Sequence, residues 1–542
     1  MSVQGNFPFY KSKLDLRQEI YTNNRKEWQK VLRIFNENLK ATGSEGNAIS
    51  TQRHQDREQL LARDRVALLL DPDSPFLELA QFAGHGLDST PCASIVAGIG
   101  LINGRACMII CSIPSIKGGA WNEFTVLKHN RMTEIANENE LPIVGLVQAA
   151  GVFLPQQFRV FHKASQMFKD LARRSASRLP SCSVVFGSST AGGAYLPGLS
   201  DYTIFVKNKA QVFLGGPPLV KMATGEIVDA ETLGGGDMHA SVTGLADQLA
   251  IDEFDAIRKA REWVKTLPER SQRLESLNEP LSPRYPAEDL LALVNPDIRK
   301  PFDMAEIVLR LVDGSRLSTF KPNYGKNLLT CWAEIHGHAT GIIGNQTPVI
   351  NPDEASKGAQ FIRLCNQRDM PIIYLHNVTG FMVGSTAEQA GIIKKGAQFV
   401  SAVSCSKVPQ ISVILGSSYG AGNYAMCGRG YNPRFLFTWP IGRCSVMGPS
   451  QLAGVMETVL TTGASAQSKA QNGQAVGGQS ANTDVFRDNV ERESESYYTS
   501  AHLLDDGVID PRDTRDILGM CLEIVKIPKV EGAVGHRSLA RL

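Results

Sequence analysis

Apolar residues along the chain follow helical spacing at first and strand spacing from about residue 94 onward. The segment Asn24 to Ala41 is amphipathic, because large apolar residues recur at nearly helical intervals among charged ones. These residues are Trp28, Val31, Leu32, Ile34 and Phe35. Glu58 to Leu70 continues in the same style, so residues 1–70 are predicted to form a helical N-terminal arm lying on the body of the protein.

From Ser94 the chain reads SIVAGIGLINGRACMIICSI, which predicts two strands joined by a hairpin turn at Asn103-Gly104. Helices and strands then alternate, and the same order returns in the second half. The first set comprises the helix Thr125 to Asn139, the strand Ile143 to Val147, the helix Phe158 to Arg178 and the strand Val184 to Phe186. The second set comprises a hairpin in Ala333 to Gly344 that turns at His336 to Gly341, the helix Glu354 to Arg368, the strands Ile372 to Leu375 and Ile411 to Leu415, and a closing helix at 514–525.

One stretch of sequence occurs twice. Pro180 to Tyr195 reads PSCSVVFGSSTAGGAY and Pro409 to Tyr424 reads PQISVILGSSYGAGNY, and at an offset of 229 they agree at eight of sixteen positions. Without a gap, the same offset also pairs Lys128 with Lys357, Asn137 with Asn366, Pro142 with Pro371, Leu146 with Leu375 and Gly151 with Gly380. A register kept over nearly seventy residues indicates a duplicated α/β domain rather than a shared short motif.

A chain of 542 residues is longer than one core usually supports, which agrees with two domains. We place the first at 71–267 and the second at 302–542. The stretch between them, 268–301, is predicted to be a linker, because its prolines interrupt helix and sheet. They are Pro268, Pro280, Pro283, Pro286, Pro296 and Pro301. Ser465 to Ser480, rich in Gln, Gly, Ala and Ser, is predicted to be a mobile loop.

The formal net charge of +2 gives no bulk attraction to nucleic acid or to a membrane surface. The N-terminus has no signal or transit pattern and no apolar run is long enough to span a bilayer, so a cytoplasmic protein is expected. The last three residues, Ala540 to Leu542, loosely resemble a peroxisomal address, and a peroxisomal or mitochondrial matrix location stays open for a eukaryotic source.

The ten cysteines lie in apolar runs without CxxC spacing and are expected to be reduced, buried and small apolar residues. His336 and His338 alternate along a predicted strand, and without a third ligand they are assigned a structural role, so no metal is expected. The chain has neither an ATP-binding loop nor a Ser-His-Asp set.

In each copy of the repeat a buried strand ends in a Gly/Ser/Ala turn. Glycine lets backbone N–H groups approach a ligand, and such groups favour negative charge. Two such turns indicate two oxyanions stabilised by preorganised donors. The alternative is that Gly192, Gly193, Gly420 and Gly422 only permit close packing of strand against helix.

Five blocks resemble the carboxyltransferase (β) subunits of biotin-dependent acyl-CoA carboxylases. They are GSSTAGGAYLPGLSDY (187–202), FLGGPPLVKMATGE (213–226), HNVTGFMVG (376–384), SYGAGNYAMCGRGYNPRFLFTWP (418–440) and DDGVIDPRDTR (505–515). The resemblance covers roughly residues 30–530, and the second turn looks like the 3-methylcrotonyl-CoA and geranyl-CoA branch.

This resemblance implies two tandem crotonase-like ββα-spiral domains, a homohexamer built as a trimer of dimers, and a partner α subunit carrying biotin carboxylase and the biotin carrier. It implies transfer of CO2 from carboxybiotin to an enoyl- or acyl-CoA. The thioester enolate would be held by the backbone of Gly192 and Gly193. The ureido oxygen of biotin would be held by Gly420 and Ala421.

Other residues near the turns have two interpretations each. Lys221, with Thr224, borders the CoA channel or belongs to a solvated helix start. Phe381 and Tyr424 line the acyl or biotin pocket, or pack in the core. The polar residues Asn377 and Asn423 bind biotin or form turns.

One segment departs from the family. Gln148 to Phe153 reads QAAGVF where relatives tend to have SGGAN, which favours a larger or more apolar acyl group if the segment borders that pocket. Geranyl-CoA or another larger acyl-CoA is therefore kept as an alternative substrate. Two further hypotheses stay open. One is a biotin-independent CoA-ester decarboxylase or hydratase, with Asp201 and Glu226 as poor stand-ins for paired glutamates, and the second is a non-catalytic scaffold.

Overall fold

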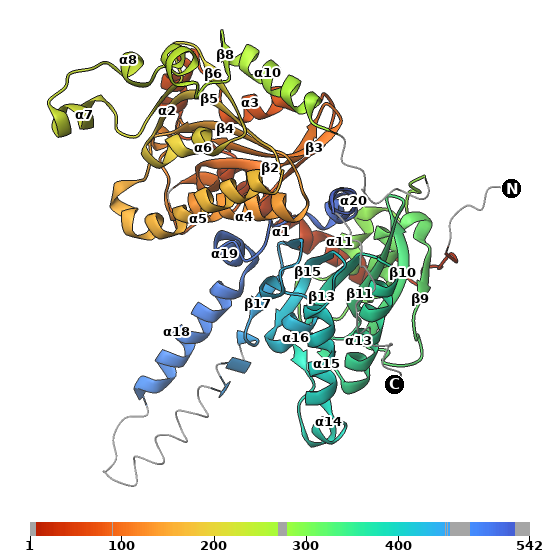
Figure 1. The fold of residues 1–542 in the computed structure, drawn as a ribbon. Helices are drawn as coiled ribbons and strands as arrows, with labels where there is room; N and C mark the ends of the chain where they lie inside the picture. Colours follow the sequence, from red (N-terminus) through yellow and green to blue (C-terminus); the bar gives the residue numbers. More distant parts are fainter. Residues whose placement is uncertain are drawn as a thin grey trace. The chain divides into compact units, whose positions relative to one another are not determined.

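The computed structural model describes residues 7–88, 90–268, 279–449, 451–452, 454–455 and 477–525. The chain divides into two compact units (Figure 1). One comprises Asn36–Ser271 and Ala501–Leu503, and the other comprises Met1–Phe35, Gln272–Ser500 and Leu504–Leu542. The division at Phe35 falls inside the long helix α1 (Glu19–Thr42). This helix lies within the predicted N-terminal arm, residues 1–70. The boundaries expected at 71, 268 and 302 remain predictions.

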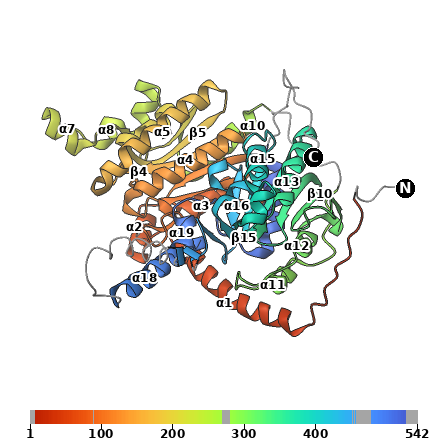
Figure 2. The same ribbon diagram turned by 90° about the horizontal axis from the view of Figure 1, so that it is seen from below.

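The first unit is built on one mixed sheet in the order β1-β2-β3-β4-β5-β6-β8, with β7 paired to β5. Helices α3 and α10 cover one face, and α4 packs with α5 over the other, which is turned toward the viewer in Figure 2. The strands are β1 (Phe76–Glu78), β2 (Ile95–Ile102), β3 (Arg105–Ser112), β4 (Ile143–Ala149), β5 (Ser181–Thr190), β6 (Tyr202–Val206), β7 (Gln211–Phe213) and β8 (Gln248–Ala250). The helices are α2 (Ala48–Gln55), α3 (Ala62–Leu69), α4 (Glu123–Glu138), α5 (Gln157–Ala176), α6 (Tyr195–Leu199), α7 (Pro217–Thr224), α8 (Ala230–Gly234), α9 (Gly236–Met238) and α10 (Glu253–Thr266).

The second unit has a sheet in the order β16-β15-β13-β11-β10-β9, with β17 paired to β15, and its helices α13 and α15 pack together. The strands are β9 (Leu317–Thr319), β10 (Leu328–Ile335), β11 (His338–Asn345), β13 (Ile372–Val378), β15 (Gln410–Tyr419), β16 (Phe435–Thr438), β17 (Arg443–Ser445), and the separate pair β12 (Val349–Ile350) and β14 (Gly380–Phe381). The helices are α11 (Leu290–Leu293), α12 (Met304–Leu311), α13 (Pro352–Gln367), α14 (Ser385–Gln389), α15 (Ile392–Ser404), α16 (Gly420–Ala425), α18 (Gly477–Ser494), α19 (Ser496–Ala501) and α20 (Thr514–Ile524).

Both units follow one plan, as the repeat predicts: an antiparallel hairpin leads into parallel strands connected through helices. Even an irregularity is duplicated. The register shifts between Val147 and Ala149 in the first unit, and between His376 and Val378 in the second, again 229 residues apart. Each unit therefore carries the same bulge beside the end of its central strand.

The paired lysines found in the sequence have matching structural roles. Lys128 is buried in α4, and its Nζ donates to the carbonyl of Ile95 at 2.7 Å. Lys357 is buried in α13, and its Nζ donates to the carbonyl of Leu328 at 2.7 Å. Burial also lowers the pKa of Lys357 to about 8, because a charged ammonium loses hydration. Each lysine thus ties a helix to the first strand of its hairpin.

Most predicted elements are confirmed, and two need correction. The turn expected at His336 to Gly341 is only His336-Gly337, both with positive φ (49° and 80°), so β11 already begins at His338. The helix predicted from Glu58 begins only at Ala62, where α3 starts. Glu58 itself has φ 55°, which is not helical.

Two further expectations concern the cysteines and the loop at 465–480. All ten cysteines are free, but Cys405 is exposed at the end of α15 and Cys444 is half-buried, so not all are core residues.

Most of the predicted loop, and the terminal tripeptide, lie outside the described residues, while 477–480 begin α18. Among the described residues, no helix has the length and apolarity needed to cross a bilayer. The cytoplasmic location stays a prediction.

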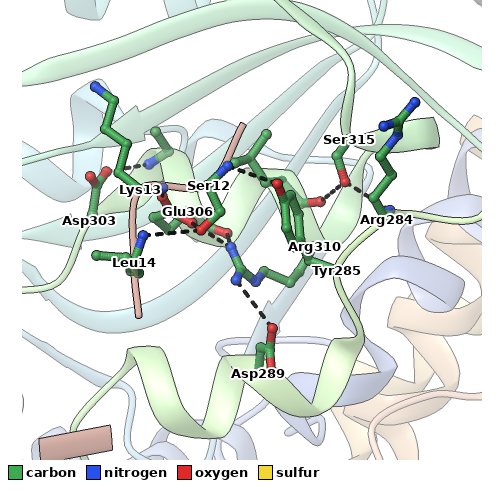
Figure 3. A network of polar contacts seen from close by, with 12 residues as sticks. Ser12, Lys13, Leu14, Arg284, Tyr285, Asp289, Asp303, Glu306, Arg310 and Ser315 are labelled. Atoms are coloured by element: carbon green, nitrogen blue, oxygen red, sulfur yellow. Dashed lines mark hydrogen bonds and ion pairs between the residues drawn. The ribbon is translucent and has the colours of Figure 1, made fainter. Parts of the chain in front are cut away.

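The start of the chain is held on the second unit by buried charges (Figure 3). Ser12 Oγ donates to Glu306 Oε2 at 2.7 Å, and the backbone N–H of Lys13 donates to the other carboxylate oxygen at 2.9 Å. Arg310, almost fully buried, bridges Glu306 and Asp289. The arm is therefore anchored through a carboxylate that needs its arginine partner.

We expect Arg310→Met to destabilise this unit by about 3–5 kcal/mol, because removing one partner of a buried pair leaves the Glu306 charge uncompensated. Urea unfolding followed by fluorescence would measure it. Arg299→Met is the control, since this guanidinium pairs with Asp297 while 87% exposed and its loss should barely move the midpoint. Equal midpoints for the two variants would contradict the expected role of Arg310.

Candidate active site

The two glycine turns have the same backbone. In the first unit β5 ends at Thr190 (φ −115°, ψ 149°), and Ala191 follows with φ 56°. In the second unit β15 ends at Tyr419 (φ −114°, ψ 148°), and Gly420 follows with φ 55°. The conformational match shows that the duplication extends to the turns themselves.

This match also sets the register between the predicted donors. Gly420 and Ala421 correspond to Ala191 and Gly192, whereas Gly193 corresponds to Gly422. The donor pairs predicted from the sequence therefore occupy different positions in the two turns. Gly192 and Gly193 are the second and third residues of the first turn, whereas Gly420 and Ala421 are the first and second residues of the second turn.

The third residue of each turn is a packing glycine. Gly193 is buried, and an added Cβ would lie 3.2 Å from Ala149 Cβ. Gly422 is also buried, and an added Cβ would lie 2.5 Å from Val378 Cγ2. Close packing of strand against helix therefore accounts for these two glycines.

The first two residues of each turn reach the surface. Ala191 and Ala421 are exposed, and Gly192 and Gly420 are half-buried. Gly192 is the second residue of the 3₁₀ turn Ala191–Ala194, and Gly420 and Ala421 are the first two residues of α16, so their N–H groups have no acceptor within their own helical turn. Unpaired N–H groups that begin a helical turn are suited to bind negative charge. Each turn can therefore stabilise one oxyanion.

Lys221 and Thr224 lie on α7, whose residues are all at least partly exposed. Lys221 is in the last turn of this helix, which corrects the alternative of a solvated helix start. Thr224 Oγ1 donates to the Val220 carbonyl at 2.9 Å, and Gly225 ends the helix with φ 78°. Whether Lys221 contacts CoA remains a prediction.

In the second unit, the predicted asparagines are already engaged. Asn377 Oδ1 accepts from the N–H of Ser417 at 3.4 Å. Asn423 Nδ2 donates to Ser418 Oγ at 2.8 Å and lies 3.7 Å from Cys444 Sγ. Asn377 thus contacts the backbone just before the second turn, whereas Asn423 contacts side chains, and a role of either in binding biotin stays a prediction.

The two predicted aromatic residues of this unit differ in exposure. The half-buried ring of Phe381 is so close to α15 that a Cβ added at Gly396 would lie 3.3 Å from it. Tyr424 is 51% exposed, and its ring lies 5.7 Å from that of Tyr431. Core packing therefore describes Phe381 better than it describes Tyr424, whose ring is available to a ligand or a partner.

The sequence interpretation missed two polar residues, His376 and Ser418. His376 is fully buried, and its Nδ1 lies 2.9 Å from Ser418 Oγ. Burial lowers the pKa of His376 to about 3. A hydrogen bond to the backbone of Met426 raises this pKa but offsets only part of the decrease. Ser418 was visible as a repeat match with Ser189, but nothing in the sequence placed a histidine against it.

The departing segment Gln148 to Phe153 turns its polar residue away from the glycine turn. Gln148 Oε1 accepts from Arg65 Nη1 at 3.2 Å, on the face of the sheet covered by α3. Ala149 lies beneath Gly193, and beyond the segment Leu154 and Phe158 are 76% and 74% exposed. The polar side chain of this segment is therefore turned away from the first turn, and two exposed apolar side chains follow the segment along the chain.

A buried carboxylate lies in the DDGVIDPRDTR block. Asp505 Oδ2 accepts from Thr438 Oγ1 at 2.8 Å, and burial raises its pKa to about 6. This pKa is above the ordinary 3.8. Between about pH 4 and pH 6 the folded protein therefore keeps a proton on Asp505 that the unfolded chain has released. The stability from this group is present below about pH 4 and is lost as the pH rises through 6.

We therefore expect the unfolding free energy of the wild type, relative to Asp505→Asn, to fall by about 2 kcal/mol from pH 4 to pH 7. Urea unfolding of both proteins across that range would measure the difference. A constant difference would show that the pKa of Asp505 is the same in the folded and the unfolded protein.

The described residues contain no group of three or more His, Cys, Asp and Glu side chains able to hold a metal ion. His336 Nε2 instead lies 3.0 Å from Asp516, and His338 begins β11.

Comparison with known proteins gives consistent matches. The chain matches the family model described as "Carboxyl transferase domain" over residues 53–532. It is 47% identical over 486 residues to the "Probable biotin-dependent acyl-coenzyme A carboxylase beta2 subunit" of Mycobacterium tuberculosis, covering 89% of this chain and 90% of that protein. It is 44% identical over 503 residues to the "Biotin-dependent 3-methylcrotonyl-coenzyme A carboxylase beta1 subunit" of the same organism, covering 92% and 94%.

Among solved structures, the β subunit of geranyl-CoA carboxylase from P. aeruginosa superposes with a TM-score of 0.86 at 41% identity, covering 96% of both chains. The likeness thus extends over nearly the whole chain, including both glycine turns.

Proposed function

This chain belongs to the carboxyl transferase domain family, and we propose that its two glycine turns act as separate oxyanion holes, one for a CoA thioester and one for biotin. Its fold of two tandem crotonase-like α/β domains and its general activity, as the carboxyltransferase subunit of a biotin-dependent acyl-CoA carboxylase, follow from that membership. The observation that carries the site assignment is the shared backbone of the turns, with φ 56° at Ala191 and 55° at Gly420.

The first turn faces the thioester. Removing a proton beside a thioester, or from the γ-methyl of an enoyl thioester, develops negative charge on the carbonyl oxygen. The N–H groups of Gly192 and Gly193 supply donors for that oxygen, and the loss of one such donor typically costs roughly 10²–10³ in rate. Because Gly192 lies nearer the surface and Gly193 is buried, Gly192 is the stronger candidate for direct contact.

The second turn faces the biotin ring. Carboxylated biotin supplies the CO2, and charge remains on its ureido oxygen as CO2 leaves. The N–H groups of Gly420 and Ala421 are placed to hold that charge, and Ala421 is the counterpart of Gly192. No nucleophilic side chain is required, which agrees with a site made mainly of backbone donors.

The biotin comes from another chain. Relatives are named as β subunits of biotin-dependent carboxylases, which supports a partner α subunit that carries biotin carboxylase and the biotin carrier. A homohexamer of this chain, arranged as a trimer of dimers, completes the proposed enzyme.

The substrate is an enoyl- or acyl-CoA of the 3-methylcrotonyl-CoA type, carboxylated at the γ-carbon, or a longer one such as geranyl-CoA. Relatives of both names match this chain over most of its length. The exposed apolar side chains of Leu154 and Phe158, which follow the segment Gln148 to Phe153 along the chain, favour the longer acyl group.

Hydration is disfavoured by the carboxylates considered for it. Asp201 Oδ2 accepts from the N–H of Ser181 at 2.9 Å and from its hydroxyl at 3.0 Å, so this carboxylate is used to hold the start of β5. Glu226 is exposed beyond the end of α7. No pair of acids therefore flanks the first turn from these two positions.

The test is to purify the protein from its source, probe for a co-eluting biotinylated chain, and measure bicarbonate fixation with a series of CoA esters from methylcrotonyl to geranyl. A biotinylated partner and ATP-dependent carboxylation of one ester are expected. Their absence for every ester would contradict the proposed function.

A further inference from the structure

We propose that His376, Ser418 and Asn423 form a buried positioning relay that holds the second glycine turn in shape. This inference rests on the proposed function, because it assigns these residues to the biotin side of the reaction. It concerns residues that act through the backbone of Gly420 and Ala421, not residues that touch a substrate.

The relay spans three adjacent elements. His376 lies on β13 at its bulge, Ser418 lies one residue before the end of β15, and Asn423 lies in the first turn of α16. Asn423 Nδ2 donates to Ser418 Oγ at 2.8 Å, and Ser418 Oγ lies 2.9 Å from His376 Nδ1. We assign the hydroxyl as the donor to Nδ1, with the imidazole proton on Nε2. The relay therefore ties the turn to its own strand and to the neighbouring one.

Its members leave little freedom. His376 and Ser418 are each 0% exposed, and buried polar groups of this kind are costly to leave unpaired. Asn423 also lies against Gly428, where an added Cβ would be only 1.9 Å from Asn423 Oδ1. A change of rotamer at Asn423 would break its hydrogen bond to Ser418.

The first unit shows that the fold does not require this relay. At the position matching His376 it has Val147, and at the position matching Asn423 it has Ala194, both buried and apolar. The serine is kept, but Ser189 Oγ donates to the carbonyl of Gly193 at 2.8 Å. The two turns have the same shape, but the serine contacts a backbone carbonyl in the first and two side chains in the second.

The difference fits the two ligands. A CoA thioester brings many further contacts that can orient its carbonyl, whereas a biotin ring on a mobile carrier brings few. A turn that must orient the biotin ring largely by its own N–H groups gains most from rigid support.

The experiment measures the reverse transfer, from a carboxylated CoA ester to free biotin, so that each substrate has its own KM. For Ser418→Ala and His376→Leu we expect kcat/KM for biotin to fall about tenfold or more, since small misplacements of reacting groups cost this much. The KM for the CoA ester should stay within about twofold. His376→Gln should recover much of the loss, because its amide oxygen can accept from Ser418.

Ser189→Ala is the matched control in the first unit. It should change kinetics toward the CoA ester and leave the KM for biotin unaltered. Equal losses for both substrates in Ser418→Ala, or equal effects of His376→Leu and His376→Gln, would overturn the relay and leave a structural role. Wild-type protein that transfers no carboxyl group would contradict the proposed function instead, so the two failures are distinguishable. If Ser418→Ala does not fold, the comparison of the two His376 variants still decides.

Discussion

Ala421→Pro is expected to lower carboxyl transfer by roughly 10²–10³, because proline removes the one N–H of the second turn that belongs to an exposed residue. Ala421 is the second residue of α16, and proline is tolerated within the first turn of a helix, so the fold should survive. Transfer by the enzyme reconstituted with its biotinylated partner would measure the loss.

Ala421→Ser is the matched control, since it keeps the N–H and adds only a hydroxyl at an exposed position. It should retain most of the wild-type rate. Full activity in Ala421→Pro, with an unchanged thermal unfolding midpoint and oligomer size, would contradict the assignment of this N–H to the biotin side.

The duplication, the element order and the turns could be predicted from the sequence because identical residues at the fixed offset have the same structural role in both units. Lys128 and Lys357 both hold the start of a hairpin, and such a buried lysine has few substitutes. Glycine at the third position of each turn is equally constrained by the strand beside it. Where a residue type is dictated by packing, its recurrence at a fixed offset reports structure directly.

The predicted donors were chosen by residue type rather than by the offset of 229. A positive φ is usually sought at glycine, but the first turn places Ala191 there, while the second places Gly420. Searching for glycines therefore shifts one pair of donors by a residue. The gapless offset of 229 pairs Gly192 with Ala421, and the backbone angles of the two turns agree with that pairing.

The bulges and the relay depend on neighbouring strands. Gln148 reads as part of a surface beside the first turn, but the bulge between Val147 and Ala149 directs it to the opposite face, toward Arg65. Likewise His376 reads as one polar residue in an apolar strand. Its partner Ser418 is 42 residues away and meets it only because β13 and β15 are paired.

The structure also changes which residue should be tested in the first turn. Gly193 is buried, and a side chain there would approach both Ser189 Oγ (3.0 Å) and Ala149 Cβ (3.2 Å), so a loss of activity in Gly193→Pro could come from disturbed packing. Gly192 is half-buried at the surface, and as the second residue of the 3₁₀ turn Ala191–Ala194 its N–H has no acceptor within that turn. It is the better position for removing a donor.

We expect Gly192→Pro to lower transfer by roughly 10²–10³ through loss of stabilisation of the thioester enolate. Gly192→Ala is the matched control: it keeps the N–H, and its Cβ would lie 3.2 Å from the Trp121 ring, a contact that a small shift relieves. The measurement is kcat/KM for the CoA ester and, in the reverse direction, for free biotin. If Gly192→Pro and Gly192→Ala lose activity equally, the added atoms rather than the missing N–H are responsible, and the first oxyanion hole must be assigned elsewhere.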